Sequence, residues 1–278
     1  MPTILFSIFV IAFLGLLLGL FLGFTAKRFE VPEDKKVNQI IACLPGANCG
    51  GCGYAGCADF ANAIVHEGAA PNRCASMTQA MKKDIENIIG SVAPEQEKKR
   101  AVVFCQGSLE HCGQITEYNG IMDCASAMLV ANGGGKSCRF SCIGLGSCSA
   151  VCPFHAIEIR NGVAFVHAEL CTGCGKCVNT CPRHIIRLVP VSEEIQILCS
   201  SQDKPVNRRK VCDAACLNCK KCLRKAPEGA MEEQNGKLII TNGKVLPENY
   251  MEEVKCPTGA LARLQISGQN YQDEDKKS

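Results

Sequence analysis

Closely spaced cysteines constrain this chain more than any other feature of its sequence. The chain has 22 cysteines among 278 residues, and the clearest group reads Cys171, Cys174, Cys177 and Cys181, followed by Pro182. Thiols only two or three residues apart favour a shared metal centre over disulfides, which are typical of short secreted chains. Small units can fold around such groups, because metal binding supplies free energy of folding that a small core lacks.

The spacing Cys-x-x-Cys-x-x-Cys-x-x-x-Cys-Pro is the ligand run of bacterial ferredoxins, in which the fourth cysteine binds a second cluster. A looser copy ends at Cys152-Pro153, and residues 157–166 alternate around Asn161-Gly162, which predicts a β-hairpin. We therefore expect a two-cluster 4Fe-4S domain over residues 133–190. Its two crossed ligand sets are Cys138, Cys142, Cys148 with Cys181, and Cys171, Cys174, Cys177 with Cys152.

The C-terminal region resembles a degenerate copy of the same repeat. Three cysteines keep the spacing, Ala226 replaces the fourth, and a second turn follows at Asn235-Gly236. Residues 245–251, where three further ligands would stand, contain no cysteine. Because the remaining cysteines are those that serve one of the two clusters, we expect a one-cluster domain over residues 191–265. Its expected ligands are Cys216, Cys219, Cys222 and Cys256.

A glycine-rich group of cysteines lies near the N-terminus. Glycine lets the backbone curl around a metal and direct N–H groups at sulfur. Residues 58–66 read as a short helix, and Ser76 to Gln79 resembles a capping box before a second amphipathic helix. Zinc suits four cysteines too, but the neighbouring ferredoxin runs favour a small helical 4Fe-4S domain over residues 27–93. The expected ligands are Cys49, Cys52, Cys57 and Cys74.

Residues 3–24 carry no charge and are followed by Lys27 and Arg28. As a helix this stretch spans roughly 33 Å, enough for a bilayer core. A cleaved signal peptide would have its basic residues before the apolar stretch, so we expect a retained single-pass anchor over residues 1–26. The positive-inside rule places the following domains in the cytoplasm. Three glycines on one face suit contact with another membrane helix: Gly15, Gly19 and Gly23.

Six cysteines follow no ligand spacing. We expect residues 94–132 to form a connector and residues 266–278 a polar tail. Cys199 or Cys212 could replace a ligand of the C-terminal group, but the matched spacing favours the assignment above. Buried or free thiols are the simpler interpretation of the others. The expected total is therefore about four 4Fe-4S clusters, and the unassigned cysteines are Cys43, Cys105, Cys112, Cys124, Cys199 and Cys212.

Basic side chains crowd around the C-terminal cysteines. A basic surface over an exposed cluster would steer an acidic redox partner, although an ordinary solvated face explains the same pattern. The candidate docking residues are Arg208, Arg209, Lys210, Lys220, Lys221, Arg224 and Lys225.

No nucleotide site or acid–base catalytic arrangement stands out in the sequence. Gly135-Lys136-Ser137 resembles the end of a phosphate-binding loop, but Val130 stands where that motif requires glycine. A net charge of +3 and the absence of Trp argue against nucleic acid as a partner. His155 and His184 follow the two prolines at equivalent positions, which suits solvated turns or hydrogen bonds near a cluster.

The anchor, the Cys49-Gly-Gly-Cys52 unit and the looser ferredoxin run together closely resemble the family of Rnf-complex B subunits, over nearly the whole chain. The resemblance implies a membrane complex that moves electrons from reduced ferredoxin to NAD, coupled to export of sodium ions or protons. It implies that the chain is a cytoplasmic iron–sulfur arm that accepts electrons from ferredoxin, while flavins and the NAD site belong to other subunits. Members with fuller C-terminal repeats carry more ligands, so Ala226 argues against a second C-terminal cluster.

The predicted fold is α+β: one N-terminal transmembrane helix, a small helical 4Fe-4S domain, a ferredoxin-like two-cluster domain and a degenerate ferredoxin-like repeat. The expected partners are other membrane subunits and soluble ferredoxin, at the cytoplasmic (inner) membrane. Two alternatives stay open: a component of the sibling complex that reduces a redox-sensing transcription factor, and a non-enzymatic zinc scaffold on the membrane.

Overall fold

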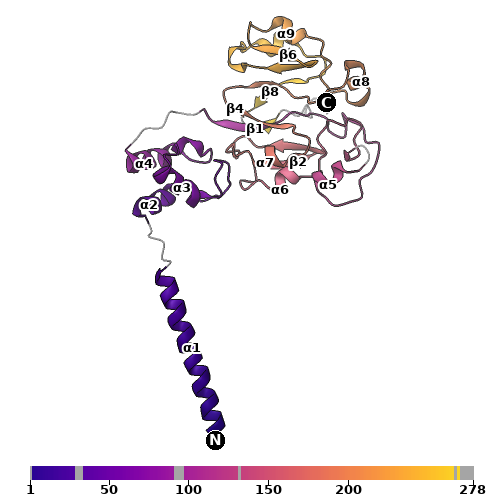
Figure 1. The fold of residues 1–278 in the computed structure, drawn as a ribbon. Coiled ribbons are helices and arrows are strands. Elements are labelled where there is room, and N and C mark those ends of the chain that lie inside the picture. The colour runs from indigo at the N-terminus through magenta and orange to yellow at the C-terminus, as the bar shows by residue number, and fades with distance from the viewer. Residues whose placement is uncertain (1, 29–33, 91–96, 131–132, 266–267, 270–278) are drawn as a thin grey trace.

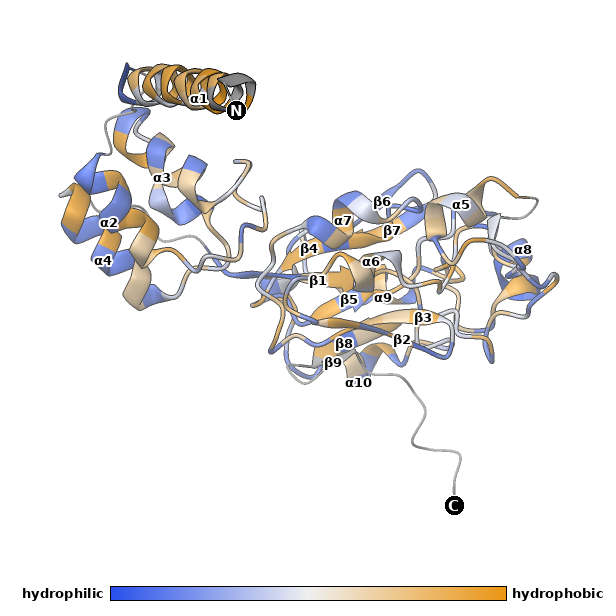
Figure 2. Ribbon diagram, turned by 90° about the horizontal axis from the view of Figure 1, so that it is seen from below, coloured by the Kyte–Doolittle hydropathy of each residue, from blue (hydrophilic) through white to orange (hydrophobic). Residues whose placement is uncertain are grey.

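A computed structural model describes residues 2–28, 34–90, 97–130, 133–265 and 268–269. Helix α1 (Pro2–Arg28) projects away from the rest of the molecule (Figure 1). Its segment Ile8–Thr25 has a mean hydropathy of 2.6 and packs against nothing in the chain, and apolar residues surround the helix on all sides (Figure 2). An exposed apolar helix of this length is suited to lipid, so α1 can serve as a membrane anchor.

The helical unit that follows forms a separate small core. Its helices are α2 (Lys35–Cys43), α3 (Cys57–His66), a 3₁₀ turn (Pro71–Arg73) and α4 (Gln79–Ile89). Ile40, Phe60 and Ile85 are almost completely buried where α2 packs on α3 and α4. The predicted helix over residues 58–66 is confirmed as α3. The predicted capping box is wrong: the N-cap of α4 is Thr78, whose hydroxyl accepts from the Met81 N–H.

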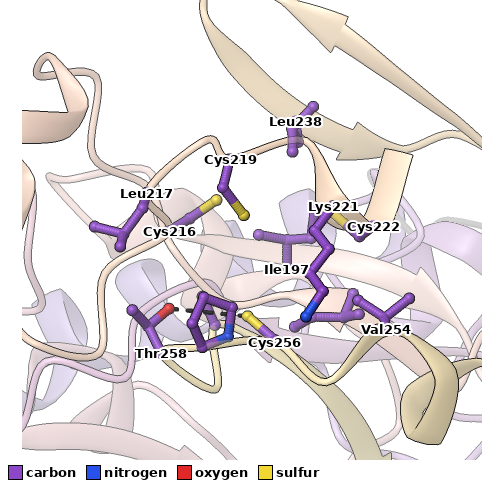
Figure 3. Close-up of a pocket in the computed structure, with 13 residues that line it drawn as sticks. Ile197, Cys216, Leu217, Cys219, Lys221, Cys222, Leu238, Val254, Cys256 and Thr258 are labelled. Atoms are coloured by element: carbon purple, nitrogen blue, oxygen red, sulfur yellow. Dashed lines mark hydrogen bonds between the residues drawn. The ribbon is translucent and has the colours of Figure 1, made fainter. Parts of the chain in front are cut away.

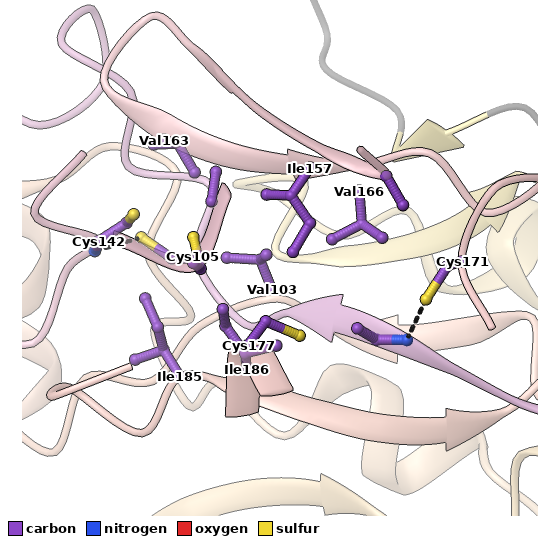
Figure 4. Close-up of a cluster of buried hydrophobic side chains, with 14 residues drawn as sticks. Val103, Cys105, Cys142, Ile157, Val163, Val166, Cys171, Cys177, Ile185 and Ile186 are labelled. Carbon is purple, nitrogen blue, oxygen red and sulfur yellow. Dashed lines mark hydrogen bonds between the residues drawn. The ribbon is translucent and has the colours of Figure 1, made fainter. Parts of the chain in front are cut away.

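The ferredoxin core is built from two antiparallel strand pairs and two short helices. Its elements are β1 (Lys99–Val103), α5 (Cys124–Met128), α6 (Ser147–Ala150), β2 (Ile157–Arg160), β3 (Val163–Val166), α7 (Lys176–Thr180) and β4 (Ile186–Pro190). β1 pairs with β4, and β2 pairs with β3. Residues from these strands, among them Val103, Ile157 and Val166, meet in one buried core (Figure 4).

The predicted hairpin is confirmed, because Asn161 and Gly162 join β2 to β3 with positive φ angles of 44° and 76°. The segment predicted to be a connector has more structure than expected. β1 lies within it and forms an outer strand of the core, and α5 packs beside the core through Ala127. Sequence spacing could not show this, because the partner strand β4 lies more than 80 residues later.

The C-terminal unit repeats the core in the same order of strands and helices (Figure 1). Its elements are β5 (Ile195–Ile197), α8 (Pro205–Val211), α9 (Lys221–Lys225), β6 (Met231–Gln234), β7 (Lys237–Ile240), a 3₁₀ turn (Gly243–Val245), α10 (Tyr250–Val254), β8 (Leu261–Gln265) and β9 (Gly268–Gln269). β5 pairs with β8, as β1 does with β4, and β6–β7 is the second predicted hairpin, turning at Asn235-Gly236.

Some predicted boundaries lie outside the described residues. These are the start of the connector at residues 94–96, its end at residues 131–132, and the polar tail apart from Gly268 and Gln269. The predicted end of the anchor at residue 26 lies within α1, which continues to Arg28.

Candidate iron–sulfur centres

The C-terminal cavity brings together all four cysteines predicted there. Its empty volume is about 360 Å³, which includes space open to solvent, and its lining is otherwise mainly apolar, with Ile197 and Leu238 among the contacts. Figure 3 shows Cys216 and Cys219 on the loop that leads into α9, Cys222 at the start of α9, and Cys256 on the segment after α10. The four are Cys216, Cys219, Cys222 and Cys256.

The first cavity of the core differs from the prediction at one ligand. Its empty volume is about 370 Å³, and Cys142, Cys148 and Cys181 line it as predicted. The fourth cysteine in the lining is Cys124, whereas Cys138 lines a different cavity. Here the crossed pattern is therefore present with Cys124 in the place assigned to Cys138.

A small hydrogen-bond network explains how Cys124 reaches this cavity. Asp123 caps α5 through the Ser126 N–H. The Ser147 hydroxyl donates to Asp123 Oδ1 at 2.8 Å and accepts from the Cys124 N–H at 2.7 Å. These bonds hold Cys124 against the loop that carries Cys148. The Asp N-cap is the only local signal that could have pointed to this segment.

The second site of the core gathers the four cysteines predicted for it. Burial raises the pKa of Cys177 to about 12, and three nearby thiols add to that rise: Cys171, Cys174 and Cys152. Backbone N–H groups already point at two of the sulfurs. Ala101 N lies 3.3 Å from Cys171 Sγ, and Ala156 N lies 3.4 Å from Cys152 Sγ. N–H···S hydrogen bonds are one of the factors that set the reduction potential of a bound iron–sulfur cluster.

The N-terminal group is also assembled in the helical unit. Burial raises the pKa of Cys74, and the other three cysteines add to the rise, so all four lie close together: Cys49, Cys52, Cys57 and Cys74. The loop between them bends at Gly50 and Gly53, whose φ angles of 69° and 91° favour glycine. Asn48 Oδ1 accepts from the Cys57 N–H at 2.8 Å and fixes the start of α3.

The N-terminal site lies directly beside the second core site. A Cβ at Gly51 would stand 2.5 Å from the Cys174 carbonyl oxygen, so only glycine allows this approach. The Ser76 hydroxyl, which was predicted to cap α4, donates to Thr172 Oγ1 at 3.3 Å instead. The two core sites are adjacent as well. Burial raises the pKa of Cys148 in the first site, and Cys124 and Cys181 add to the rise. Cys177 of the second site also contributes, so it must lie near Cys148.

The donor sets fit polynuclear clusters better than single metal ions. In the part of the chain that the structure describes, no three Cys, His, Asp or Glu side chains lie close enough to share one ion. Zinc with Zn–S bonds of about 2.3 Å would need its sulfurs within about 4 Å of one another. Burial raises the pKa of Cys142 to about 12. A bound cationic metal centre would hold such buried sulfurs as thiolates.

One of the predicted docking residues is misassigned. Arg208 is only 2% exposed, and its guanidinium donates to the carbonyl oxygens of Asp203, Cys216 and Gly236 at 2.6, 2.9 and 3.1 Å. Arg208 therefore holds the loop that carries Cys216 in place and is not part of the protein surface. The other six are exposed. Lys220, Lys221, Arg224 and Lys225 lie at or on α9, beside the C-terminal site, and Arg209 and Lys210 lie on α8.

Two other sequence features have structural roles. Lys136 is buried, and its ammonium donates to the carbonyl oxygens of Gly107 and Gly162 at 2.7 and 2.6 Å, so the resemblance to a phosphate-binding loop does not reflect a surface loop. His155 and His184 are exposed, with positive φ angles of 48° and 50° at equivalent turns. The solvated-turn interpretation of these histidines fits their positions.

Comparison with known proteins agrees with the assembled cysteine groups. The family described as "Putative Fe-S cluster" matches residues 44–76, and the "LdpA Fe-S cluster-binding domain" matches residues 138–191. A Methanosarcina acetivorans protein, named as the B subunit of an ion-translocating oxidoreductase complex, is 39% identical over 81% of this chain and 85% of its own.

Two further relatives carry more specific names, and both are B subunits of ferredoxin:NAD(+) oxidoreductase complexes. The relative from the proton-translocating complex of Clostridium ljungdahlii is 34% identical over 99% of this chain and 98% of its own. The relative from the Na(+)-translocating complex of Acetobacterium woodii is 40% identical over 77% of this chain and 64% of its own.

Proposed function

The chain belongs to the B-subunit family of ion-translocating oxidoreductase complexes, and from that premise we propose that it is the membrane-anchored iron–sulfur subunit of a ferredoxin:NAD oxidoreductase complex. It accepts electrons from reduced ferredoxin and passes them to partner subunits in the membrane. The cofactors are 4Fe-4S clusters, one for each of the four cysteine groups described above. A bound cluster supplies reversible one-electron storage, and the protein has no acid–base chemistry of its own to perform.

The observation that carries this proposal is the contact between cysteine groups of different units. Gly51 packs against Cys174, which brings the N-terminal site up to the second core site. Short distances between redox centres are what an electron relay requires, whereas a metal scaffold has no need of them. The unit nearest the anchor thus meets the ferredoxin core at a redox site, and this supports a route that crosses domain borders.

The chain's own residues prepare these sites for electron transfer. Buried apolar side chains around the cysteines, such as Val103 and Ile186 in the core, exclude water. Backbone N–H groups at Ala101 and Ala156 stabilise negative charge on the sulfurs. Because these donors belong to a strand and a tight turn, they need little rearrangement when the charge on the site changes.

The anchor supports a cytoplasmic position for the domains. Lys27 and Arg28 end α1, directly after its apolar span, and cytoplasmic flanks of membrane helices are enriched in such residues. Nothing lies within 4 Å of a Cβ at Gly15, Gly19 or Gly23, so this face of α1 is open to a neighbouring membrane helix of the complex.

The exposed basic residues around the C-terminal site are proposed to receive ferredoxin, an acidic partner by charge complementarity. Cys219 is the one exposed cysteine among the described residues, and Lys221 lines the same cavity. A cluster held there would lie near the surface, where a soluble donor can approach it.

Two alternatives lead to different outcomes. The sibling complex that reduces a transcription factor would use the same subunit design, so only the electron acceptor distinguishes it. A zinc scaffold is disfavoured by the wide sulfur spacing, since no three ligands among the described residues lie close enough for one ion.

The test uses the full-length chain, purified without oxygen in detergent and reconstituted with iron and sulfide. We expect acid-labile sulfide in equal amount to iron, and brown absorption that bleaches when reduced ferredoxin is added. Cys57→Ala should remove one EPR signal and leave the others, while Cys43→Ala, which changes a cysteine outside the four groups, should remove none. Stoichiometric zinc without sulfide would refute the proposal.

A further inference from the structure

A third cavity of about 350 Å³ is lined by four cysteines that belong to none of the other groups in the structure. They come from distant parts of the chain: Cys105, Cys138, Cys199 and Cys212. A fifth, Cys112, is completely buried in the same group of side chains as Cys138, Cys199 and Cys212. Five thiols gathered from separate segments are far more than chance burial of inert cysteines explains.

The fold brings these thiols together through specific backbone contacts. Cys105 and Cys199 form an isolated antiparallel bridge that joins the segment after β1 to the segment after β5. Cys212 is the C-cap of α8, and the Asp213 N–H donates to the His111 carbonyl oxygen at 3.1 Å. A Cβ at Gly107 would lie 3.5 Å from Cys212 Sγ and 3.6 Å from Cys105 Sγ, so the backbone there passes close to two of the sulfurs.

Two buried cations flank this cavity. Arg208 lines it directly, and Lys136 donates to Gly107, whose backbone touches the cysteines. Both are 5% exposed or less, and both donate only to carbonyl oxygens. No ion pair among the described residues involves either one.

Buried charges in proteins are normally paired, because an isolated one is costly. The missing partner is therefore an anion in or beside the cavity. Four thiolates around an iron–sulfur core form a group with net negative charge, and this group would satisfy both cations. The clusters proposed at Cys142 and Cys216 lie near Lys136 and Arg208 respectively, and a cluster in this cavity would be a counter-charge that faces both cations.

The cavity lies between the core and the C-terminal site. On one side the Cys142 N–H donates to Cys105 Sγ at 3.3 Å (Figure 4). On the other side Cys216 packs against the buried group that contains Cys199. Arg208 joins this side too, since it lines the cavity and donates to the Cys216 carbonyl oxygen at 2.9 Å.

We propose that this cavity holds a fifth iron–sulfur cluster, with Cys105, Cys138, Cys199 and Cys212 as ligands, Lys136 and Arg208 as its counter-charges, and Cys112 as a non-ligand neighbour. The inference extends the proposed function, because a cluster here connects the core sites to the C-terminal site. It also explains why Cys138 leaves the cavity to which the ferredoxin spacing assigned it.

The first experiment counts clusters in the full-length reconstituted chain. The wild type should hold about five clusters, or about twenty iron atoms with equal sulfide. Cys138→Ala/Cys199→Ala should lose about four iron atoms and one EPR signal, whereas Cys112→Ala and Cys43→Ala should keep all of them. A wild type with four clusters and an unchanged double variant would overturn this inference alone. Absence of sulfide from the wild type would overturn the proposed function as well.

A second variant decides the matter if the double variant does not fold. Lys136→Gln keeps a donor for the Gly107 carbonyl but removes the charge. With a cluster in the cavity, the iron content stays the same and two clusters titrate at more negative potentials: the cluster in this cavity, and the core cluster at Cys142, whose thiol also interacts with Lys136. Lys98→Gln, a change at an exposed residue, should leave every potential unchanged. A shift of one cluster alone, or of none, in Lys136→Gln would rule out a cluster in this cavity.

Discussion

The ferredoxin core and the C-terminal unit have the same order of helices and strands, but different side chains fill their interiors. In the core, two sets of cysteines flank the buried strands β2 and β3. In the C-terminal unit one set of cysteines lines the cavity, and Tyr250 packs with Leu246 and Ala226 in the apolar core of the unit. With one cluster proposed where the core has two, the C-terminal unit depends more on ordinary apolar side chains, because metal binding contributes less to its folding.

The two units also differ in which residue types adopt the left-handed backbone conformation (positive φ) at corresponding positions. In the core, α6 and α7 start after Gly146 and Gly175, whose φ angles are 83° and 81°. In the C-terminal unit the matching N-cap of α9 is Lys220, with φ of 57°. The turns that follow the cysteines show the opposite exchange, because the core has histidines there and the C-terminal unit has Gly229 and Gly259. The two units thus share a backbone shape at these positions while the residue type differs.

The largest expected effect tests the apolar core of the C-terminal unit. Tyr250 is completely buried, and its hydroxyl donates to the Cys222 carbonyl oxygen at 2.7 Å. Tyr250→Ala should destabilise the C-terminal unit by about 3–5 kcal/mol, whereas Tyr250→Phe should cost about 1 kcal/mol by removing one hydrogen bond. The measurement is the urea concentration at which the EPR signal of the C-terminal cluster disappears. Equal effects of both variants would show that packing does not stabilise this unit.

The next effect concerns Arg208, the buried arginine that the sequence placed among the surface docking residues. Arg208→Met removes the donors to three carbonyl oxygens and should cost about 2–3 kcal/mol. Arg209→Met, at the exposed neighbouring position, should change stability by less than about 0.5 kcal/mol. Thermal denaturation of the two reconstituted variants compares them directly. A similar loss in both would contradict the anchoring role of Arg208.

The sequence predicted local features of both units well, because local chemistry determines them. The turns at Asn161-Gly162 and Asn235-Gly236 need positive φ angles, which this pair favours. The fate of Cys138 could not be predicted, since the ferredoxin spacing assigns it to the core while the fold turns it toward Cys199, more than 60 residues later. Burial of Arg208 was equally invisible, because its partners are backbone carbonyls and no residue type encodes them.

A reciprocal exchange of the N-cap residues should have a smaller effect. Gly175→Lys places a side chain on a left-handed backbone and should destabilise the core by about 1–2 kcal/mol, since a Cβ there meets only Leu188 at an ordinary 3.8 Å. Lys220→Gly should relieve the same strain and stabilise the C-terminal unit by about 0.5–1 kcal/mol, reduced by loss of the exposed ion pair with Glu233. Urea titrations of both variants, followed by cluster absorption, test the pair. A loss of stability in Lys220→Gly would show that the ion pair outweighs the backbone strain.

The smallest expected effect is on the rate of reduction by ferredoxin, and it tests which of the two units an electron donor can approach. The core cysteines are buried or half-buried, while Cys219 of the C-terminal unit is exposed beside Lys221. If ferredoxin docks there, Lys221→Glu should slow reduction of the chain about threefold at low salt, and the difference should vanish at high salt because such attraction is screened. Lys83→Glu, an equal charge change on the exposed surface of the helical unit, is the control. Equal slowing by both substitutions would show that only the total charge of the chain matters. It would then contradict docking of ferredoxin at the C-terminal site.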